Sequence, residues 1–104
     1  LQRAIETLKA KKPGVKVEFE ADRIEQVEQF LNLRGLDRIL LDNMTIANLS
    51  KAVALNAGRL ELEASGGVTL KTIRAIAETG VDFVSVGALT HSAPAVDLSL
   101  EFYS

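Results

Sequence analysis

The stretch GLDRILLD, residues 35–42, and the stretch GVDFVSVG, residues 80–87, share one pattern. In each, a glycine suited to end a helix is followed by an aspartate and a short apolar run typical of a strand. Similar runs at residues 15–20 and 59–64 each follow another such glycine, so that the four glycines recur every 21 to 23 residues. This period fits tight βα units with brief loops, and consecutive βα units predict a parallel sheet.

The segments between these runs have the apolar spacing of amphipathic helices, over residues 24–31, 46–53 and 70–77. Thr45 and Thr69 are suited to cap the second and third of these helices. Asp22 and Glu25 have the spacing of a capping box ahead of the first. Helical spacing is already present at residues 1–8, so we expect the chain to be a truncation, a proteolytic fragment or an engineered piece of a longer protein.

Two of the predicted strands alternate between polar and apolar side chains. Lys16, Glu18 and Glu20 occupy one face of the first strand, and Glu61 and Glu63 occupy one face of the third. A parallel strand covered by helices on both faces is almost wholly apolar, and burying unpaired carboxylates is costly. A polar face instead fits the lumen of a barrel with helices outside. The predicted fold class is therefore α/β, with consecutive βα units and a parallel sheet of four strands, about half of a (β/α) barrel.

Composition limits the classes of function. The chain has 104 residues, 47% hydrophobic and 25% charged, with a net charge of −2 and no cysteine. These values are typical of one small globular domain or a piece of a larger one. The weak negative charge argues against a nucleic-acid partner, no apolar run approaches the length of a membrane span, and disulfides are excluded. We expect a cytoplasmic protein with neither a nucleic-acid nor a membrane partner.

Acidic side chains stand where the predicted strands end, at Glu20, at Asp42, and at Glu63 with Ser65. In parallel βα folds, reactive groups gather at these carboxyl ends. Three carboxylates on one rim suit a hard divalent cation such as Mg²⁺, held in part through water and substrate phosphate. The alternative is that each acid caps a helix or is a solvated surface charge. Three acids in register favour the cation site.

A glycine-rich turn at residues 65–67 joins the third strand to the next helix. Glycines let the backbone approach an anion, which the N–H groups of a helix start attract. The next strand ends in Gly87 and Ala88, and in phosphate-binding barrels the loops after the last two strands form the phosphate site. His91, the only histidine, lies close by and can donate to a phosphate oxygen. We predict a phosphate site here, with a ligand-free glycine turn and a structural histidine as the alternatives.

Three longer motifs, LLDNM (residues 40–44), LEASGGVT (62–69) and ETGVDFVSVGALTHSAP (78–94), resemble quinolinate phosphoribosyltransferases. The resemblance implies that residues 1–104 are the C-terminal half of an α/β barrel, whose first strands and N-terminal domain lie outside the chain. It implies transfer of phosphoribose from phosphoribosyl pyrophosphate to quinolinate with loss of CO₂, giving nicotinate mononucleotide and pyrophosphate in NAD biosynthesis. It also implies Mg²⁺ and a homo-oligomer in which a neighbouring subunit completes each active site.

Matched motif by motif, the resemblance implies roles for particular residues. Glu20 matches an acid at the ribose and the metal-bound pyrophosphate, and Asp42 matches its partner on the next strand. The phosphate-binding loops match a set of small residues with a histidine nearby: Ser65, Gly66, Gly67, Gly87, Ala88 and His91. In the family, the cations that bind quinolinate lie upstream of the part matched here. We therefore expect the isolated chain to have no transferase activity.

Two other interpretations stay open. The chain fits an engineered or excised half-barrel that folds alone and self-associates without catalysis, because its edge strands would be unpaired. It also fits a different phosphate-binding barrel, such as a ribulose-phosphate or indole-glycerol-phosphate enzyme. The GALTHS run at residues 87–92 argues against the second of these.

Overall fold

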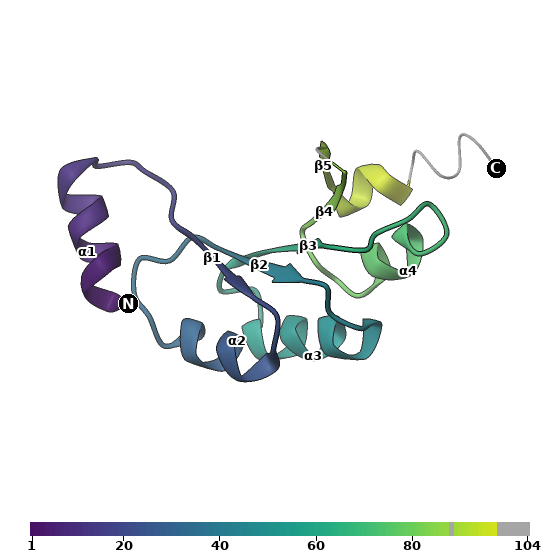
Figure 1. The fold of residues 1–104 in the computed structure, drawn as a ribbon, viewed down its shortest axis with the longest axis horizontal. Coiled ribbons are helices and arrows are strands. Elements are labelled where there is room, and N and C mark those ends of the chain that lie inside the picture. The colour runs from purple at the N-terminus through teal and green to yellow at the C-terminus, as the bar shows by residue number, and fades with distance from the viewer. Residues whose placement is uncertain (88, 98–104) are drawn as a thin grey trace.

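A computed structural model of the chain describes residues 1–87 and 89–97 (Figure 1). In chain order the elements are α1 (Gln2–Lys11), β1 (Glu18–Ala21), α2 (Ile24–Leu31), β2 (Arg38–Asp42), α3 (Ile46–Asn56), β3 (Glu61–Ser65), α4 (Ile73–Glu78), β4 (Phe83–Val86) and β5 (Leu89–Ser92). Residues 93–97 are also helical. Among residues 1–87 and 89–97, none of the helices has the length and apolar character of a membrane span.

The described residues form one five-stranded sheet in the order β1-β2-β3-β4-β5. Neighbours from β1 to β4 are parallel, which confirms the predicted βα units. The prediction of four strands is incomplete, because β5 adds an antiparallel strand beside β4. Val86 pairs with Leu89, so only two residues separate the strands. A connection of that length cannot hold a crossover helix and makes a hairpin instead.

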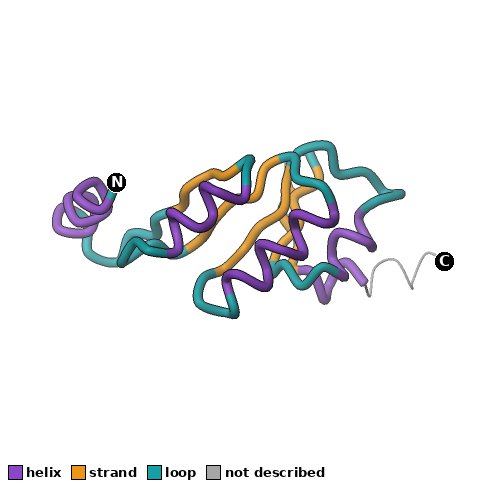
Figure 2. Tube along the Cα trace, turned by 90° about the horizontal axis from the view of Figure 1, so that it is seen from below, coloured by secondary structure: helices purple, strands orange, loops and turns teal. Residues whose placement is uncertain are grey.

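Helices cover one face of the sheet. Figure 1 shows α2 and α3 on the same side of β1–β3, and Figure 2, seen from below, shows these helices in front of the strands, with α1 off to one side. The strands direct apolar side chains into this layer, where the buried members are Ala21, Ile39, Leu41, Leu62, Ala64 and Val84. The alternate positions lie on the other face, which we call the open face: Glu18, Glu20, Arg38, Leu40, Asp42, Glu61, Glu63, Ser65, Phe83 and Ser85. The prediction of one polar face is confirmed.

The repeated GxD motif has the same structural role in both copies. The Asp37 carboxylate accepts a hydrogen bond from the Val17 N–H (2.7 Å), and the Asp37 N–H donates to the Val17 carbonyl (2.9 Å). Asp82 makes the same pair of hydrogen bonds with Leu62, at 2.8 and 2.9 Å. Each aspartate therefore ties its strand to the preceding strand at the amino edge of the sheet. The bond from Val17 and the ammonium of Lys9 lower the pKa of Asp37.

The predicted cap of α3 is confirmed, since the Thr45 hydroxyl accepts from the Asn48 N–H at 3.1 Å. The predicted capping box of Asp22 and Glu25 is wrong. Helix α2 begins one residue later than that box requires, and the Gln26 side chain accepts from the backbone N–H groups of Asp22 (2.7 Å) and Arg23 (3.1 Å).

Thr69 does not cap α4 with its side chain. Residues 70–72 form a turn ahead of the helix, and the Thr69 N–H donates to the Thr72 hydroxyl at 3.0 Å. The carbonyl of Thr69 still accepts from the Ile73 N–H at 2.9 Å. The helical hydrogen bonds therefore begin at Thr69, although regular helix begins later.

The predicted N-terminal helix is confirmed as α1, which lies beside the amino end of β1 (Figure 1). Ile5 is its buried anchor, and the Gln2 side chain exchanges two hydrogen bonds with the backbone of Arg34. Leu1 and Leu8 of the same stripe remain 67% and 48% exposed. One face of α1 is therefore solvated in this chain.

Candidate functional site

The predicted acids and the glycine turn lie at one edge of the sheet. Because β1 to β3 are parallel, their carboxyl ends meet at the same edge. Asp42 is in register with Ser65, and Glu20 is in register with Leu40, one row below on the open face. The structure therefore brings Glu20, Asp42 and Ser65 to one face and one edge.

The turn after β3 carries three consecutive backbone N–H groups that have no acceptor in the part of the chain that the structure describes. Gly66 and Gly67 have φ values of 81° and 66°, which glycine adopts without strain. Within the described residues, the N–H groups of Gly66, Gly67 and Val68 donate no hydrogen bond. Consecutive N–H groups in a turn form a concavity that binds anions. The geometry of this turn therefore suits a phosphate group.

The second predicted loop is described in part. Gly87 follows β4 with a φ of 61°, and Ala88 lies outside the described residues. His91 is on β5, paired with Val84, whose side chain is buried under the helices. Paired residues on neighbouring strands share a face, so the exposed His91 side chain lies on the face opposite to Ser85 and Thr90. The structure does not bring His91 to the face that carries Glu20, Asp42 and Ser65.

Arg38 organises the open face below this edge. Its guanidinium donates to Glu63 (2.9 Å) and Glu61 (3.2 Å) and lies 4.1 Å from the ring centroid of Phe83. The other oxygen of Glu63 accepts from the Ser85 hydroxyl, which lies 2.9 Å from the Thr90 hydroxyl. Glu63 is only 8% exposed and is held on both oxygens. It therefore serves as the anchor of this network.

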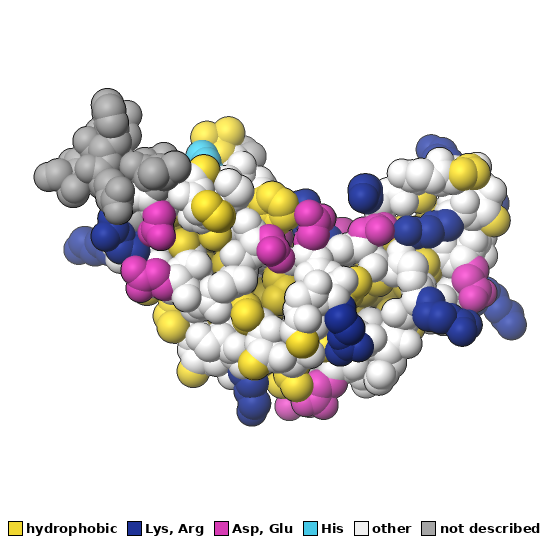
Figure 3. All heavy atoms as spheres, turned by 180° about the vertical axis from the view of Figure 1, so that it is seen from behind, with side chains coloured by type: hydrophobic (Ala, Val, Ile, Leu, Met, Phe, Trp, Pro, Cys, Tyr) yellow, Lys and Arg dark blue, Asp and Glu magenta, His cyan; other side chains and the backbone are white. Residues whose placement is uncertain are grey.

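Negative charge exceeds positive charge on the open face. Figure 3 shows acidic side chains along the hollowed upper side of the molecule. Burial, followed by repulsion from Glu63, raises the pKa of Glu18, against the opposing effect of Arg38. The described residues contain no group of three or more acidic or histidine side chains placed to hold a metal ion. Glu63 is engaged with Arg38 and Ser85, which leaves Glu20 and Asp42 as the strand-end acids for the predicted cation, so the Mg²⁺ site stays a prediction.

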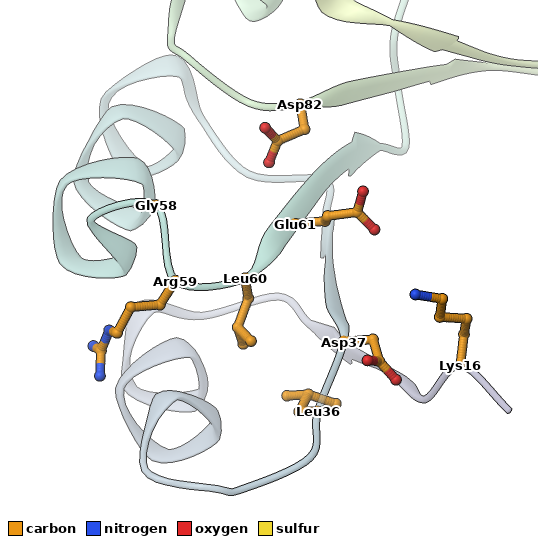
Figure 4. Close-up of a pocket in the computed structure, with 8 residues that line it drawn as sticks. All are labelled: Lys16, Leu36, Asp37, Gly58, Arg59, Leu60, Glu61 and Asp82. Carbon is orange, nitrogen blue, oxygen red and sulfur yellow. The ribbon is translucent and has the colours of Figure 1, made fainter. Parts of the chain in front are cut away.

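A separate cavity of about 330 Å³ lies at the opposite, amino edge of the sheet (Figure 4). It is lined by Lys16, Leu36, Asp37, Gly58, Arg59, Leu60, Glu61 and Asp82. Two of its acids, Asp37 and Asp82, accept backbone hydrogen bonds, and Arg59 donates to carbonyls at the end of α3. At this edge of a βα sheet, such groups serve stability. The carboxyl edge is therefore the candidate site.

The sequence did not predict a structural role for Asn43 or the hydrogen bonds that Glu63 accepts from Arg38 and Ser85. Asn43 has a φ of 54°, and its N–H donates to the Ser65 carbonyl at 2.8 Å. The available signal was an asparagine directly after a strand-ending aspartate, because asparagine tolerates the left-handed region better than other residues with a side chain.

Phosphate-binding βα proteins typically have a parallel βα sheet with a glycine turn at its carboxyl edge, and the described residues of this chain have that architecture. The chain belongs to the quinolinate phosphoribosyl transferase family, since residues 1–101 match the family description "Quinolinate phosphoribosyl transferase, C-terminal domain".

Relatives and solved structures agree with this membership. The chloroplastic nicotinate-nucleotide pyrophosphorylase [carboxylating] of Arabidopsis thaliana is 43% identical, over 92% of this chain and 32% of that protein. The Mycobacterium leprae protein of the same name is 37% identical, over 94% of this chain and 35% of that protein. The crystal structure of nicotinate-nucleotide pyrophosphorylase from Ehrlichia chaffeensis has a TM-score of 0.73 and 41% identity, over 83% of this chain and 31% of that one. The chain thus spans about a third of the length of these relatives.

Proposed function

We propose that this chain supplies the phosphate- and ribose-holding part of a quinolinate phosphoribosyltransferase. The reaction transfers phosphoribose from phosphoribosyl pyrophosphate to quinolinate, with loss of CO₂ and pyrophosphate, and gives nicotinate mononucleotide for NAD biosynthesis. The observation that carries the proposal is the shared edge of Glu20, Asp42 and the turn at Gly66 and Gly67. Family membership names the reaction class.

The groups at this edge suit the charges of the reaction. Phosphoribosyl transfer develops positive charge on the ribose and negative charge on the departing pyrophosphate. In the proposal, the free N–H groups of Gly66 and Gly67 hold the 5′-phosphate, while Glu20 and Asp42 orient the ribose hydroxyls. Gly87 and Ala88 would form the second phosphate loop. A role for His91 stays a prediction, since its side chain lies on the other face of β5.

Magnesium fits the donor set of this edge in part. Glu20 and Asp42 offer two carboxylates on the open face, and Mg²⁺ is commonly held by one or two carboxylates together with waters and substrate phosphates. We propose that these two acids hold the ion in this way. When bound, the ion would neutralise charge on the pyrophosphate.

The remaining parts of the active site would come from outside this chain. Arg38, the one arginine of the described open face, already donates to Glu61 and Glu63. A quinolinate dianion therefore needs further cations. We propose that the remainder of the barrel and a neighbouring subunit of a homo-oligomer supply them. The isolated chain should then be inactive. The expected cytoplasmic location stays a prediction, and the Arabidopsis thaliana relative is named chloroplastic.

A chimera tests the function. Residues 1–104 would replace the matching third of the Mycobacterium leprae relative, and nicotinate mononucleotide formed from quinolinate and phosphoribosyl pyrophosphate would be measured. We expect turnover, its loss in Glu20→Ala, and no change in Glu28→Ala on the exposed side of α2. A folded chimera that neither turns over nor binds nicotinate mononucleotide more tightly than an unrelated sugar phosphate would contradict the proposal.

Self-association is the competing function, favoured by the free edge of β1 and the open face. A second copy placed over that face would set carboxylates against carboxylates, which is unfavourable. Analytical ultracentrifugation of the isolated chain tests self-association, because closure by a second copy requires a dimer and a strict monomer would exclude it.

A further inference from the structure

Asn43 holds an uncommon backbone conformation beside the candidate site. Among the described residues, Asn43 (φ 54°) and Ala57 (φ 49°) are the two non-glycine residues with positive φ. Ala57 caps the end of α3, where a left-handed residue is usual. Asn43 instead follows β2 directly and, like the Asp42 carboxylate, lies against the glycine turn. A helix end therefore does not explain its conformation.

The contacts of Asn43 join the two halves of the site. Its N–H donates to the Ser65 carbonyl at 2.8 Å, which extends the β2–β3 ladder one step beyond the paired Asp42 and Ser65. A Cβ added to Gly66 would lie 2.6 Å from the Asp42 carboxylate oxygen Oδ1 and 2.9 Å from the Asn43 nitrogen. A Cβ on Gly67 would lie 3.3 Å from Asn43 Oδ1. The turn and the Asp42–Asn43 backbone are therefore packed together without room for a side chain.

We propose that Asn43 is a positioning residue, whose left-handed backbone holds the turn at Ser65–Gly67 against Asp42. Binding of a phosphate group to the turn is thereby coupled to the placement of the Asp42 carboxylate. The inference deepens the proposed function and rests on it.

The physical reason lies in the direction of the Asn43 N–H. The peptide between Asp42 and Asn43 continues β2 and directs this group to the Ser65 carbonyl, and the positive φ of Asn43 then turns the following residues away from the sheet toward α3. Among the described residues, the N–H groups of Gly66, Gly67 and Val68 have no acceptor. Because β2 and α3 fix the two ends of this connection, a residue that avoids positive φ would force the Asp42–Asn43 peptide to rotate and would turn its N–H away from Ser65. The turn would then lose its contact with β2, and the free donors would no longer be held as one group.

Two variants separate the backbone from the side chain. Asn43→Ala and Asn43→Gly both delete the amide group, but only glycine adopts positive φ freely. Ribose 5-phosphate would be titrated into the 104-residue chain, and its Kd read from the ¹⁵N–¹H signals of Gly66 and Gly67. We expect a Kd at least about fivefold higher in Asn43→Ala and within about twofold of the parent chain in Asn43→Gly.

A matched control removes the effect of general destabilisation. Ala57→Val strains the other positive-φ residue, at the end of α3, and should lower stability without changing Kd, which is measured on folded signals alone. In the unsubstituted chain, saturating ribose 5-phosphate should also slow hydrogen exchange at the Asn43 N–H. This group donates to the Ser65 carbonyl and not to the ligand, so slower exchange would report that ligand binding stabilises the contact between the turn and β2. This exchange measurement decides the question if Asn43→Ala does not fold.

The outcomes distinguish the inference from the proposed function. If ribose 5-phosphate shifts neither Gly66 nor Gly67 in the parent chain, the phosphate site is absent and both fall. If the parent chain binds, but Asn43→Ala binds equally well or Asn43 exchange is unchanged, only the positioning role is overturned.

Discussion

Replacing Gly66 with alanine should damage the protein more than the same change at Gly58. Both glycines have similar positive φ values, 81° and 76°. A Cβ on Gly58 would meet nothing within 4 Å, whereas a Cβ on Gly66 would lie 2.6 Å from Asp42 Oδ1 and 2.9 Å from the backbone nitrogen of Asn43. Gly58→Ala is therefore a matched control for backbone strain without steric overlap.

The size of the effect follows from these two contributions. Positive φ costs an alanine about 1 kcal/mol at either position. Forcing an atom into a closely packed region costs about 1–3 kcal/mol more, because the obstacle at Gly66 includes a backbone nitrogen. We expect a loss of about 2–4 kcal/mol in the free energy of unfolding for Gly66→Ala and about 1 kcal/mol for Gly58→Ala.

Urea denaturation followed by circular dichroism measures both losses, and titration with ribose 5-phosphate measures the consequence for the site. Gly66→Ala should weaken binding at least about tenfold through displacement of Asp42 and the turn, while Gly58→Ala should leave it unchanged. Losses of stability that agree within about 0.5 kcal/mol would refute the reasoning. Unimpaired binding by Gly66→Ala would refute the link between the turn and the site.

Three further predictions concern the framework. Asp82→Ala should lower the free energy of unfolding by about 2 kcal/mol, because it removes the acceptor of the buried Leu62 N–H. Asp82→Asn should lower it by less than half as much, and equal losses for the two variants in urea denaturation would contradict this. The pKa of Asp37 is lowered from 3.8 in the folded state, so its contribution is present above that pH and lost as the pH falls toward the folded-state value. Asp37→Asn should therefore flatten the acid limb of the stability curve, and an unchanged limb would count against the assignment. Glu63→Gln should lower the free energy of unfolding by about 1–2 kcal/mol. A double-mutant cycle with Arg38→Gln should give a coupling energy above about 0.5 kcal/mol, and additive losses would show that the pair contributes nothing to stability.

The sequence predicted the features that depend on local spacing. Helix-ending glycines at regular intervals predicted the βα units, and the alternation of Glu61 and Glu63 with Leu62 predicted one polar face. Both patterns are written within single elements, where the side-chain period follows from backbone geometry. For the same reason, the position of Glu20 and Asp42 at strand ends followed from the sequence, although their roles remain proposals.

Helix caps were predicted less well, because they depend on where the first turn begins. A shift of one residue at α2 moved the capping role from Glu25 to Gln26. The turn at residues 70–72 moved the start of α4 away from Thr69. Neighbouring residues in each segment satisfy the capping rule about equally well, so the rule alone does not decide at which residue the helix begins.

The sequence by itself determined the order of the elements, the polar face and the glycine turn at the carboxyl edge. The tertiary structure alone decided that β5 runs antiparallel, that His91 faces away from Asp42, and that Asn43 meets Ser65. It also decided that Glu63 is engaged by Arg38 and Ser85. Most of these contacts join residues more than twenty positions apart, so they depend on strand register. The direction of β5 depends on the length of the turn that precedes it. Strand register and turn length are not encoded in the periodicity of a single element, so the sequence pattern did not predict them.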